Sequence, residues 1–168
     1  MGNKKIKTFF IIAFFPIAII FYLLRFFYKI IQRKFIKNYL SSISLDSIDN
    51  LSGNEFEEML YYLLLSHGLK VTKTKKSHDY GADLIIHNKD KIIVIQCKLY
   101  TKHAVGNSAV QEIYTATNYY NANIGIIATN SHFSKSAITL AEKSGIILWN
   151  REYLSNLLKC KNKKFINF

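Results

Sequence analysis

The sequence predicts an α/β protein in which helices flank a mixed β-sheet. From residue 51 on, segments with the helical spacing of apolar residues alternate with short runs rich in isoleucine and valine. Their order along the chain is αβββαβαβα, so three consecutive strands precede strands that are separated by helices. Hydrophobic residues make up 49% of the 168-residue chain, which is enough to fill a core between the sheet and the helices.

The first half of this region predicts a helix and three strands. LSGNEFEEMLYYLLLSHG (51–68) has apolar residues at helical spacing and ends at a glycine, which is a helix stop signal. A short strand follows in LKVT. The runs ADLIIH and KIIVIQCK are separated by the turn-prone NKD, so together they predict a β-hairpin.

The second half alternates helices and strands. SAVQEIYTATNYYN (108–121) is compatible with a helix, and IGIIATN (124–130) has the β-branched composition of a strand. FSKSAITLAEKSG (133–145) predicts an amphipathic helix that starts at Ser134 and ends at Gly145. IILW (146–149) then predicts the last strand and REYLSNLL the last helix.

The N-terminal segment predicts a transmembrane anchor. TFFIIAFFPIAIIFYLL (8–24) carries no charge, and RFFYKII extends the apolar run to residue 31, which is long enough to span a bilayer if Arg25 reaches the headgroups. A cleaved signal peptide is the competing interpretation, but its apolar region would be shorter and no small-residue cleavage site follows. We therefore expect a tail at 1–7, a transmembrane anchor at 8–31 and a basic, polar linker at 32–50.

The charges beside this segment predict its orientation. Three lysines precede the apolar run, and a larger basic cluster accompanies and follows its end. The positive-inside rule places that cluster, and everything after it, in the cytoplasm. We therefore expect a single-pass protein of the cell membrane, with the lipid bilayer as one partner.

The charge of the chain indicates an anionic partner. The formal net charge is +12 and the pI is about 9.6. Up to position 49 there are eight basic and two acidic residues, and beyond it 15 and nine, so half of the excess belongs to the region with the sheet. Such a surface favours nucleic acid or an acidic membrane. Cys97 and Cys160 lie far apart without metal-ligand spacing, which argues against a disulfide framework or a zinc site and fits a reducing compartment.

Three polar residues interrupt the apolar hairpin: Asp83 near its start, and Gln96 and Lys98 near its end. Gln96 and Lys98 share one face of their strand because side chains alternate between faces. With the turn centred on NKD, Asp83 lies opposite residue 95, whereas a register shifted by one residue brings it opposite Gln96. The three side chains can therefore converge at the open end of the hairpin, but a one-residue slip would reverse the faces, so the pattern alone leaves this open.

The chemistry of such a cluster can be predicted directly. Carboxylate and carbonyl oxygens at close range suit Mg²⁺. Asp83 would supply the charge, and the Gln96 amide oxygen and the Cys97 backbone carbonyl would complete the protein ligands. A lysine beside the ion can orient a water and stabilise charge on a phosphate. The set fits phosphodiester hydrolysis, and the alternative is an edge hairpin with solvated polar ends.

The hairpin and its surroundings resemble a known family. GADLII followed by IQCKLY resembles the D-(x)n-QxK variant of the PD-(D/E)xK nucleases, in particular the Mrr-type restriction endonuclease catalytic domain. LSGNEFEEMLYYLLLSHGLKV resembles that family's opening G-x-x-F-E helix and strand, and VQEIYTATNYYNANIGIIATNSHFSKSAITLAEKSGIILWNREYL resembles its later half. The resemblance covers 51–158. It implies a restriction-endonuclease-like catalytic domain there, followed by a basic tail at 159–168.

The resemblance also implies roles for single residues. Asp83 matches the metal-binding acid and Lys98 the catalytic lysine. Gln96 stands where other branches have Glu or Asp, which removes one negative charge and should weaken metal binding. Glu57, in G-x-x-F-E, matches a helix-borne acid that supports the metal site. Gln111 is a candidate for a further helix residue that faces the site.

These inferences combine into an expected function. The protein would be a membrane-anchored, Mg²⁺-dependent endonuclease, with Mn²⁺ as a substitute ion, that cuts double-stranded DNA in restriction or defence against foreign DNA. Cutting both strands would need two active sites, so we expect a homodimer. Candidate DNA contacts are the lysines Lys73, Lys75, Lys76 and Lys102. Two alternatives stay open: a nucleic-acid binding module of the same fold without catalysis, and a membrane-tethered interaction protein.

Overall fold

The computed structural model describes residues 2–75, 80–100, 102–160 and 166, with side chains described from Ile17 on. The chain divides into two compact units, Met1–Asn38 and Tyr39–Phe168. The first consists of most of helix α1 (Gly2–Ser41). The second contains the β-sheet and all the other helices of the described residues, and it carries the candidate site.

Helix α1 does not support the expected transmembrane anchor. Within the described residues, we find no helix that is both long enough and apolar enough to cross a bilayer. In the part of α1 whose side chains are described, from Ile17 on, positive charges begin at Arg25, so the uncharged run there is only eight residues long. A helix needs about 20 predominantly apolar residues to span a bilayer. The predicted localisation in the cell membrane is therefore wrong, and the lipid bilayer is not supported as a partner.

The segment that we expected to be a linker, 32–50, is largely helical. Helix α1 continues to Ser41, and the short helix α2 (Leu45–Ile48) follows. A capping box starts α2: the Ser47 backbone N–H donates to Ser44 Oγ over 3.2 Å, and the Ser44 N–H donates to Ser47 Oγ over 2.9 Å. Ile48 is buried in the core of the second unit. Sequence reasoning missed α2 because one turn of helix has no apolar period of its own.

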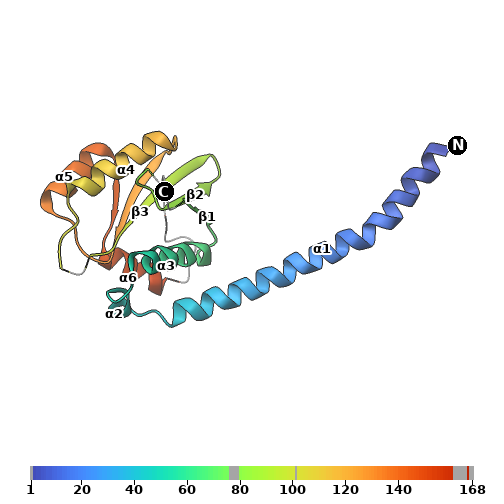
Figure 1. The fold of residues 1–168 in the computed structure, drawn as a ribbon, viewed down its shortest axis with the longest axis horizontal. Helices are drawn as coiled ribbons and strands as arrows, with labels where there is room; N and C mark the ends of the chain where they lie inside the picture. The colour runs from blue at the N-terminus through green and yellow to red at the C-terminus, as the bar shows by residue number, and fades with distance from the viewer. Residues whose placement is uncertain (1, 76–79, 101, 161–165, 167–168) are drawn as a thin grey trace. The chain divides into compact units, whose positions relative to one another are not determined.

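In the described residues, five strands form one mixed sheet (Figure 1). They are β1 (Lys70–Lys73), β2 (Leu84–Asn88), β3 (Lys91–Lys98), β4 (Ile124–Thr129) and β5 (Ile147–Trp149). The spatial order equals the sequence order. The pairs β1–β2 and β2–β3 are antiparallel, whereas β3–β4 and β4–β5 are parallel. The carboxyl ends of β3, β4 and β5 therefore lie at the same edge of the sheet.

Helices cover both faces of the sheet, as the sequence predicts (Figure 1). Helices α3 (Gly53–Ser66) and α6 (Arg151–Lys159) pack on one face, and α4 (Asn107–Tyr119) and α5 (Lys135–Ser144) pack on the other. Alternate side chains of β3 enter the two cores: Ile93 and Ile95 face α3, whereas Val94 faces α4. The predicted order of helices and strands is confirmed, with α1 and α2 added before it.

Local signals account for the helix ends. Ser52 starts α3 with a capping box, in which its N–H donates to Glu55 Oε2 over 2.7 Å and the Glu55 N–H donates to Ser52 Oγ. Helix α5 starts at Ser134, whose Oγ accepts from the Ala137 N–H, and ends at Gly145 in the left-handed conformation (φ 68°). Both ends of α5 agree with the predicted ones.

Candidate active site

The register of the hairpin brings two of the predicted residues together. Leu84 pairs with Ile95 and Asn88 pairs with Lys91, so the regular ladder ends next to Asp83 and Gln96. The Asp83 N–H donates to the Ile95 carbonyl over 2.8 Å, so the regular pairing does not continue to Asp83 and Gln96. Of the two registers that the sequence left open, the structure has the shifted one. Gln96 and Lys98 lie on the α4 face of the sheet, where both contact Glu112, and Asp83 lies at the same end of the hairpin.

The Asp83 carboxylate is held against the backbone of β3. Its Oδ2 accepts the Cys97 N–H over 2.6 Å. On the other side, the Asp83 carbonyl accepts both the N–H and the hydroxyl of Thr74, at 2.9 and 3.1 Å. Three hydrogen bonds to two flanking segments thus fix this residue at the end of β2. A carboxylate held in this way needs little reorganisation to bind a cation.

Gln96 and Lys98 both contact Glu112 of α4. Gln96 Nε2 donates to Glu112 Oε2 over 2.6 Å, and Lys98 Nζ lies 2.7 Å from the same oxygen. Burial raises the pKa of the Glu112 carboxyl, but the hydrogen bonds from Lys98 and Gln96 outweigh burial, and the pKa lies below its ordinary value. Glu112 is therefore ionised at neutral pH and joins the two strand residues from the side of the helix.

The carbonyl oxygen of the Gln96 side chain, Oε1, takes no part in these contacts. Gln96 is only 4% exposed, and its Oε1 is buried without a hydrogen-bond partner among the described residues. A buried carbonyl oxygen without a partner costs about 1–3 kcal/mol. Since hard cations such as Mg²⁺ and Mn²⁺ bind oxygen atoms, this oxygen, at the end of the hairpin that also carries Asp83, fits such an ion.

Glu57 and Cys97 lie on the other face of the same strand end. Burial raises the pKa of the Cys97 thiol well above its ordinary value, and the negative charges of Asp83 and Glu57 raise it further. Asp83 and Glu57 are therefore both close enough to act on this thiol, Glu57 from α3. The Cys97 side chain packs against the core between the sheet and α3, so the protonated thiol is part of that core and only the backbone of Cys97 faces the site.

Among the described residues, no group of three or more His, Cys, Asp and Glu side chains could hold a metal ion by itself. The oxygen atoms near Asp83 are instead of mixed origin: one fixed carboxylate, one buried amide oxygen and the backbone around Cys97. This donor set suits an ion that keeps several waters, as Mg²⁺ does.

The loop before Asp83 packs against α4. Gly81 has a positive φ of 88°, and a Cβ at this position would lie 3.0 Å from the Glu112 carbonyl oxygen. The ring of Tyr80 stacks on that of Tyr119, with centroids 3.7 Å apart. Both contacts join the loop to α4, and the glycine allows the loop backbone to approach the helix at Glu112.

Sequence reasoning missed Glu112 and named its neighbour Gln111. Gln111 is exposed on α4, and its carbonyl accepts the Thr115 hydroxyl. The Glu112 side chain is itself 45% exposed, but the residue lies three positions after Ala109 and four before Ala116, both of which are buried. In the sequence, this helical spacing of a charged residue from apolar ones is the signal that could have identified Glu112.

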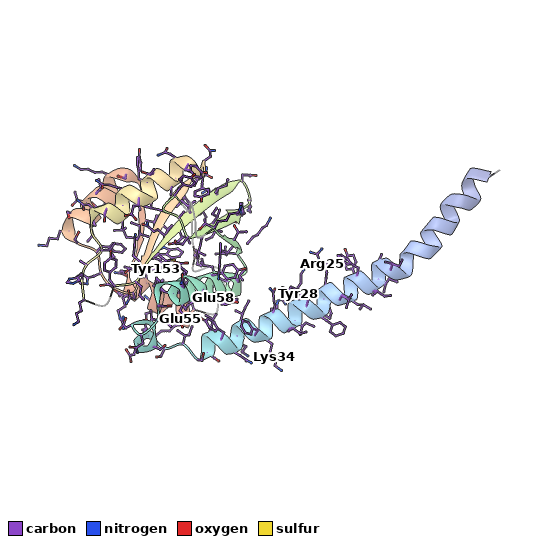
Figure 2. All side chains as sticks on the ribbon, in the orientation of Figure 1. Arg25, Tyr28, Lys34, Glu55, Glu58 and Tyr153 are labelled. Atoms are coloured by element: carbon purple, nitrogen blue, oxygen red, sulfur yellow. The ribbon has the colours of Figure 1, made fainter. Side chains whose placement is uncertain are left out.

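The predicted DNA contacts that the structure describes have different surroundings. Lys73 forms an ion pair with Glu58 over 3.0 Å and lies over the Tyr61 ring. Glu58 belongs to α3, like the capping residue Glu55 (Figure 2). Lys75 and Lys102 are exposed in loops, and Lys76 lies outside the described residues.

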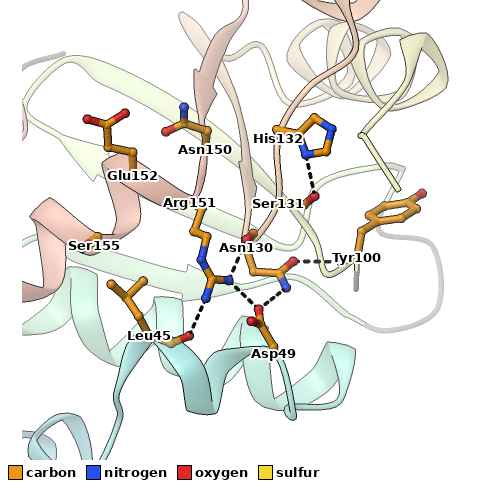
Figure 3. Close-up of a pocket in the computed structure, with 10 residues that line it drawn as sticks. All are labelled: Leu45, Asp49, Tyr100, Asn130, Ser131, His132, Asn150, Arg151, Glu152 and Ser155. Carbon is orange, nitrogen blue, oxygen red and sulfur yellow. Dashed lines mark hydrogen bonds and ion pairs between the residues drawn. The ribbon is translucent and has the colours of Figure 1, made fainter. Parts of the chain in front are cut away.

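A pocket of about 540 Å³ opens at the same sheet edge, beyond Lys98 (Figure 3). Its polar groups mostly bond to one another. Asp49 Oδ1 accepts from Arg151 Nη1 over 2.6 Å and from Asn130 Nδ2 over 2.9 Å, and Asn130 Oδ1 accepts the Tyr100 N–H over 2.8 Å. Arg151 Nη2 also donates to the Leu45 carbonyl over 3.2 Å. We interpret this network as a structural link of α2 to the ends of β4 and β5.

Comparison with known families shows the family to which the chain belongs. The profile of a family described as restriction endonuclease (Mrr_cat) matches residues 48–158, well over half of the sequence. The chain belongs to this restriction endonuclease family. Membership supports a nuclease activity, and restriction endonuclease domains generally depend on a divalent metal ion.

Three solved structures match the chain, and one of them reaches a TM-score above 0.5. The protein of unknown function AF1548 matches with a TM-score of 0.51 and 21% identity, over 58% of this chain and 57% of that one. A second match is the MspJI restriction endonuclease in complex with a 27-mer oligonucleotide, with a TM-score of 0.46 and 17% identity, over 61% of this chain and 26% of that one. A third is the DNA modification-dependent restriction endonuclease AspBHI, with a TM-score of 0.46 and 14% identity, over 72% of this chain and 37% of that one. This chain spans 57% or less of their lengths. No curated protein matches its sequence.

Proposed function

We propose that this protein is a Mg²⁺-dependent endodeoxyribonuclease, with Mn²⁺ as a substitute ion, that hydrolyses phosphodiester bonds in the restriction of foreign DNA. One observation carries the proposal: in a member of the restriction endonuclease family, Asp83, Gln96 and Lys98 meet at one end of the hairpin, and the buried Gln96 Oε1 lacks a protein partner. A structural hairpin end would have no reason to bury that oxygen unpaired.

The proposed roles follow from the contacts. Asp83, fixed by the Cys97 N–H, and the Gln96 amide oxygen would hold the ion, together with the Cys97 carbonyl, and Glu57 would add negative charge from α3. When bound, the ion would polarise the phosphate and lower the pKa of a coordinated water. The Lys98 ammonium would orient the attacking water and stabilise the charge that builds on the phosphate. Water adds to phosphorus, one P–O ester bond breaks, and a phosphate monoester and a hydroxyl result.

The test compares the full-length protein with Asp83→Asn and Lys98→Ala on supercoiled plasmid, with Mg²⁺, Mn²⁺ or EDTA. Asp90→Asn and Lys91→Ala are matched controls, because these residues lie at the opposite end of the same hairpin. We expect metal-dependent nicking by the wild type and both controls, and rates lower by about 10²–10³-fold in the two site variants.

Two results would contradict the proposal. Cleavage that survives both site substitutions would mean that the site lies elsewhere or that the activity is a contaminant. A plasmid that stays intact in every lane but is retarded on a gel would favour a DNA-binding module without turnover.

Cleavage of both DNA strands would need a second active site, so we propose a homodimer for double-strand breaks. The ratio of linear to nicked plasmid should then rise with protein concentration, because only the dimer would place two sites on one duplex. A ratio that does not depend on concentration would indicate independent nicking events.

A further inference from the structure

Glu112 contacts both polar side chains that β3 contributes to the site. The same oxygen, Oε2, lies 2.6 Å from Gln96 Nε2 and 2.7 Å from Lys98 Nζ. The contact joins elements of different kinds, a strand of the hairpin and the helix that follows it. It is also close to the loop that carries Asp83, because Gly81 approaches the backbone of Glu112.

A neighbouring carboxylate fixes the orientation of an amide side chain. An ionised carboxylate can only accept hydrogen bonds, and a glutamine side chain donates only through its Nε2. Glu112 therefore selects the Nε2 end of Gln96, and the carbonyl oxygen Oε1 must point the other way. That oxygen is the buried one that has no hydrogen-bond partner among the described residues.

We propose that Glu112 is a positioning residue for a divalent cation: it fixes the Gln96 amide so that Oε1 faces the ion, and it adds the negative charge that a glutamine on β3 lacks. This inference rests on the proposed nuclease site. It explains how a site with a neutral residue at position 96 attracts a cation, since the missing carboxylate is supplied from α4. Glu112 also holds the Lys98 ammonium at the end of β3, because Lys98 Nζ lies 2.7 Å from Glu112 Oε2.

The alternative is that the Lys98–Glu112 pair is an ordinary surface ion pair. Their side chains are 25% and 45% exposed. At such exposure an ion pair contributes about 0–1 kcal/mol to stability, and its loss would leave metal binding unchanged. The two interpretations therefore differ in metal affinity far more than in stability.

The substitution Glu112→Gln distinguishes the positioning role from the ordinary surface ion pair. The new side chain has the same size, but its amide can donate to Gln96 Oε1 and turn the Gln96 amide around. We expect the affinity of the full-length protein for Mn²⁺ alone, measured by the EPR signal of the free ion without DNA, to fall about 10–100-fold. Thermal unfolding should change little. Glu142→Gln, on the exposed face of α5, is the matched control.

A swap of the two residues tests the mechanism. In the double variant Gln96→Glu with Glu112→Gln, the new amide at 112 can donate to one carboxylate oxygen at 96, which leaves the other oxygen for the ion. We expect Mn²⁺ affinity within a few-fold of the wild type.

Two results would overturn the inference alone: a wild type and Glu112→Gln that bind Mn²⁺ equally, or a double variant that binds no better than Glu112→Gln. A wild type that binds no Mn²⁺ at all would remove the proposed metal site, and the inference would fall with it.

Discussion

Gly81 is a single residue on which the geometry of the site depends. Its φ of 88° lies in the region that favours glycine, and an added Cβ would lie 3.0 Å from the Glu112 carbonyl oxygen and 3.2 Å from its carbonyl carbon. Backbone atoms cannot move aside as a side chain can. Only Ala82 separates Gly81 from Asp83, so a shift of the loop moves the carboxylate that we propose as the metal ligand.

Gly81→Ala should therefore lower both stability and cleavage. We expect a loss of 1 kcal/mol or more in the free energy of unfolding, measured by urea denaturation, because the native φ is unfavourable for alanine. Cleavage should fall by more than this loss of folded protein explains. Gly53→Ala is the control, because Gly53 is helical and nothing lies near its missing Cβ. Equal cleavage by both variants would show that the loop tolerates the shift.

At the scale of elements, Arg151 links α2, the end of β4 and the start of α6. Its guanidinium contacts Asp49 after α2 and the carbonyl of Asn130 after β4, and Asn130 also donates to Asp49 (Figure 3). The hydrogen bond from Arg151 and then that from Asn130 hold the pKa of the Asp49 carboxyl below its ordinary value. The ionised form of Asp49 thus belongs to the folded protein.

This pKa has a predictable effect on stability. Because the pKa is lower in the folded state, the stabilisation is fully present above the unfolded pKa and is lost as pH falls through the folded pKa. Asp49→Asn should therefore destabilise the protein at pH 7, by about 1 kcal/mol after solvent screening of a carboxylate that is 41% exposed.

The difference from the wild type should shrink at pH 3, as measured by thermal unfolding at both pH values. The control is Asp46→Asn, whose fully exposed carboxylate lies 3.9 Å from Arg151 and should matter less. A difference that is the same at pH 3 and pH 7 would mean that the charge of Asp49 is not what links these elements.

At the scale of the whole molecule, the net charge of +12 predicts that binding to DNA depends strongly on salt. Each phosphate contact contributes about −0.9 to the slope of log K against log salt for duplex DNA. Asp83→Asn, which should not cleave, allows the measurement with a fluorescent duplex. We expect Lys102→Gln in this background to reduce the slope by about one.

Lys70→Gln is the matched control for that measurement. Lys70 is exposed and pairs with His87, at the end of the hairpin away from Asp83. Its removal lowers the net charge as much as the removal of Lys102 does. If both substitutions change the slope equally, the salt dependence comes from overall charge and not from a contact beside the site.

The sequence by itself determined the helices and strands from residue 51 on, and the residues of the hairpin that carry the site. Apolar spacing and β-branched runs are local signals, and each described element has a buried side that such signals report. The resemblance of the motifs also pointed to the family to which the chain belongs. The predicted membrane anchor was wrong, because the described part of α1 contains no stretch that is both long enough and apolar enough to cross a membrane.

Only the tertiary structure decided the register and the membership of the site. A two-residue turn, Lys89 and Asp90 with Lys89 at φ 52°, pairs Asn88 with Lys91, and the regular pairing then runs up to Leu84 opposite Ile95. Glu112 contacts Gln96 and Lys98 because α4 crosses the same face of the sheet, 14 residues after Lys98 in sequence. Local propensities predict neither the strand register nor the docking of α4, since both depend on how distant segments pack against each other.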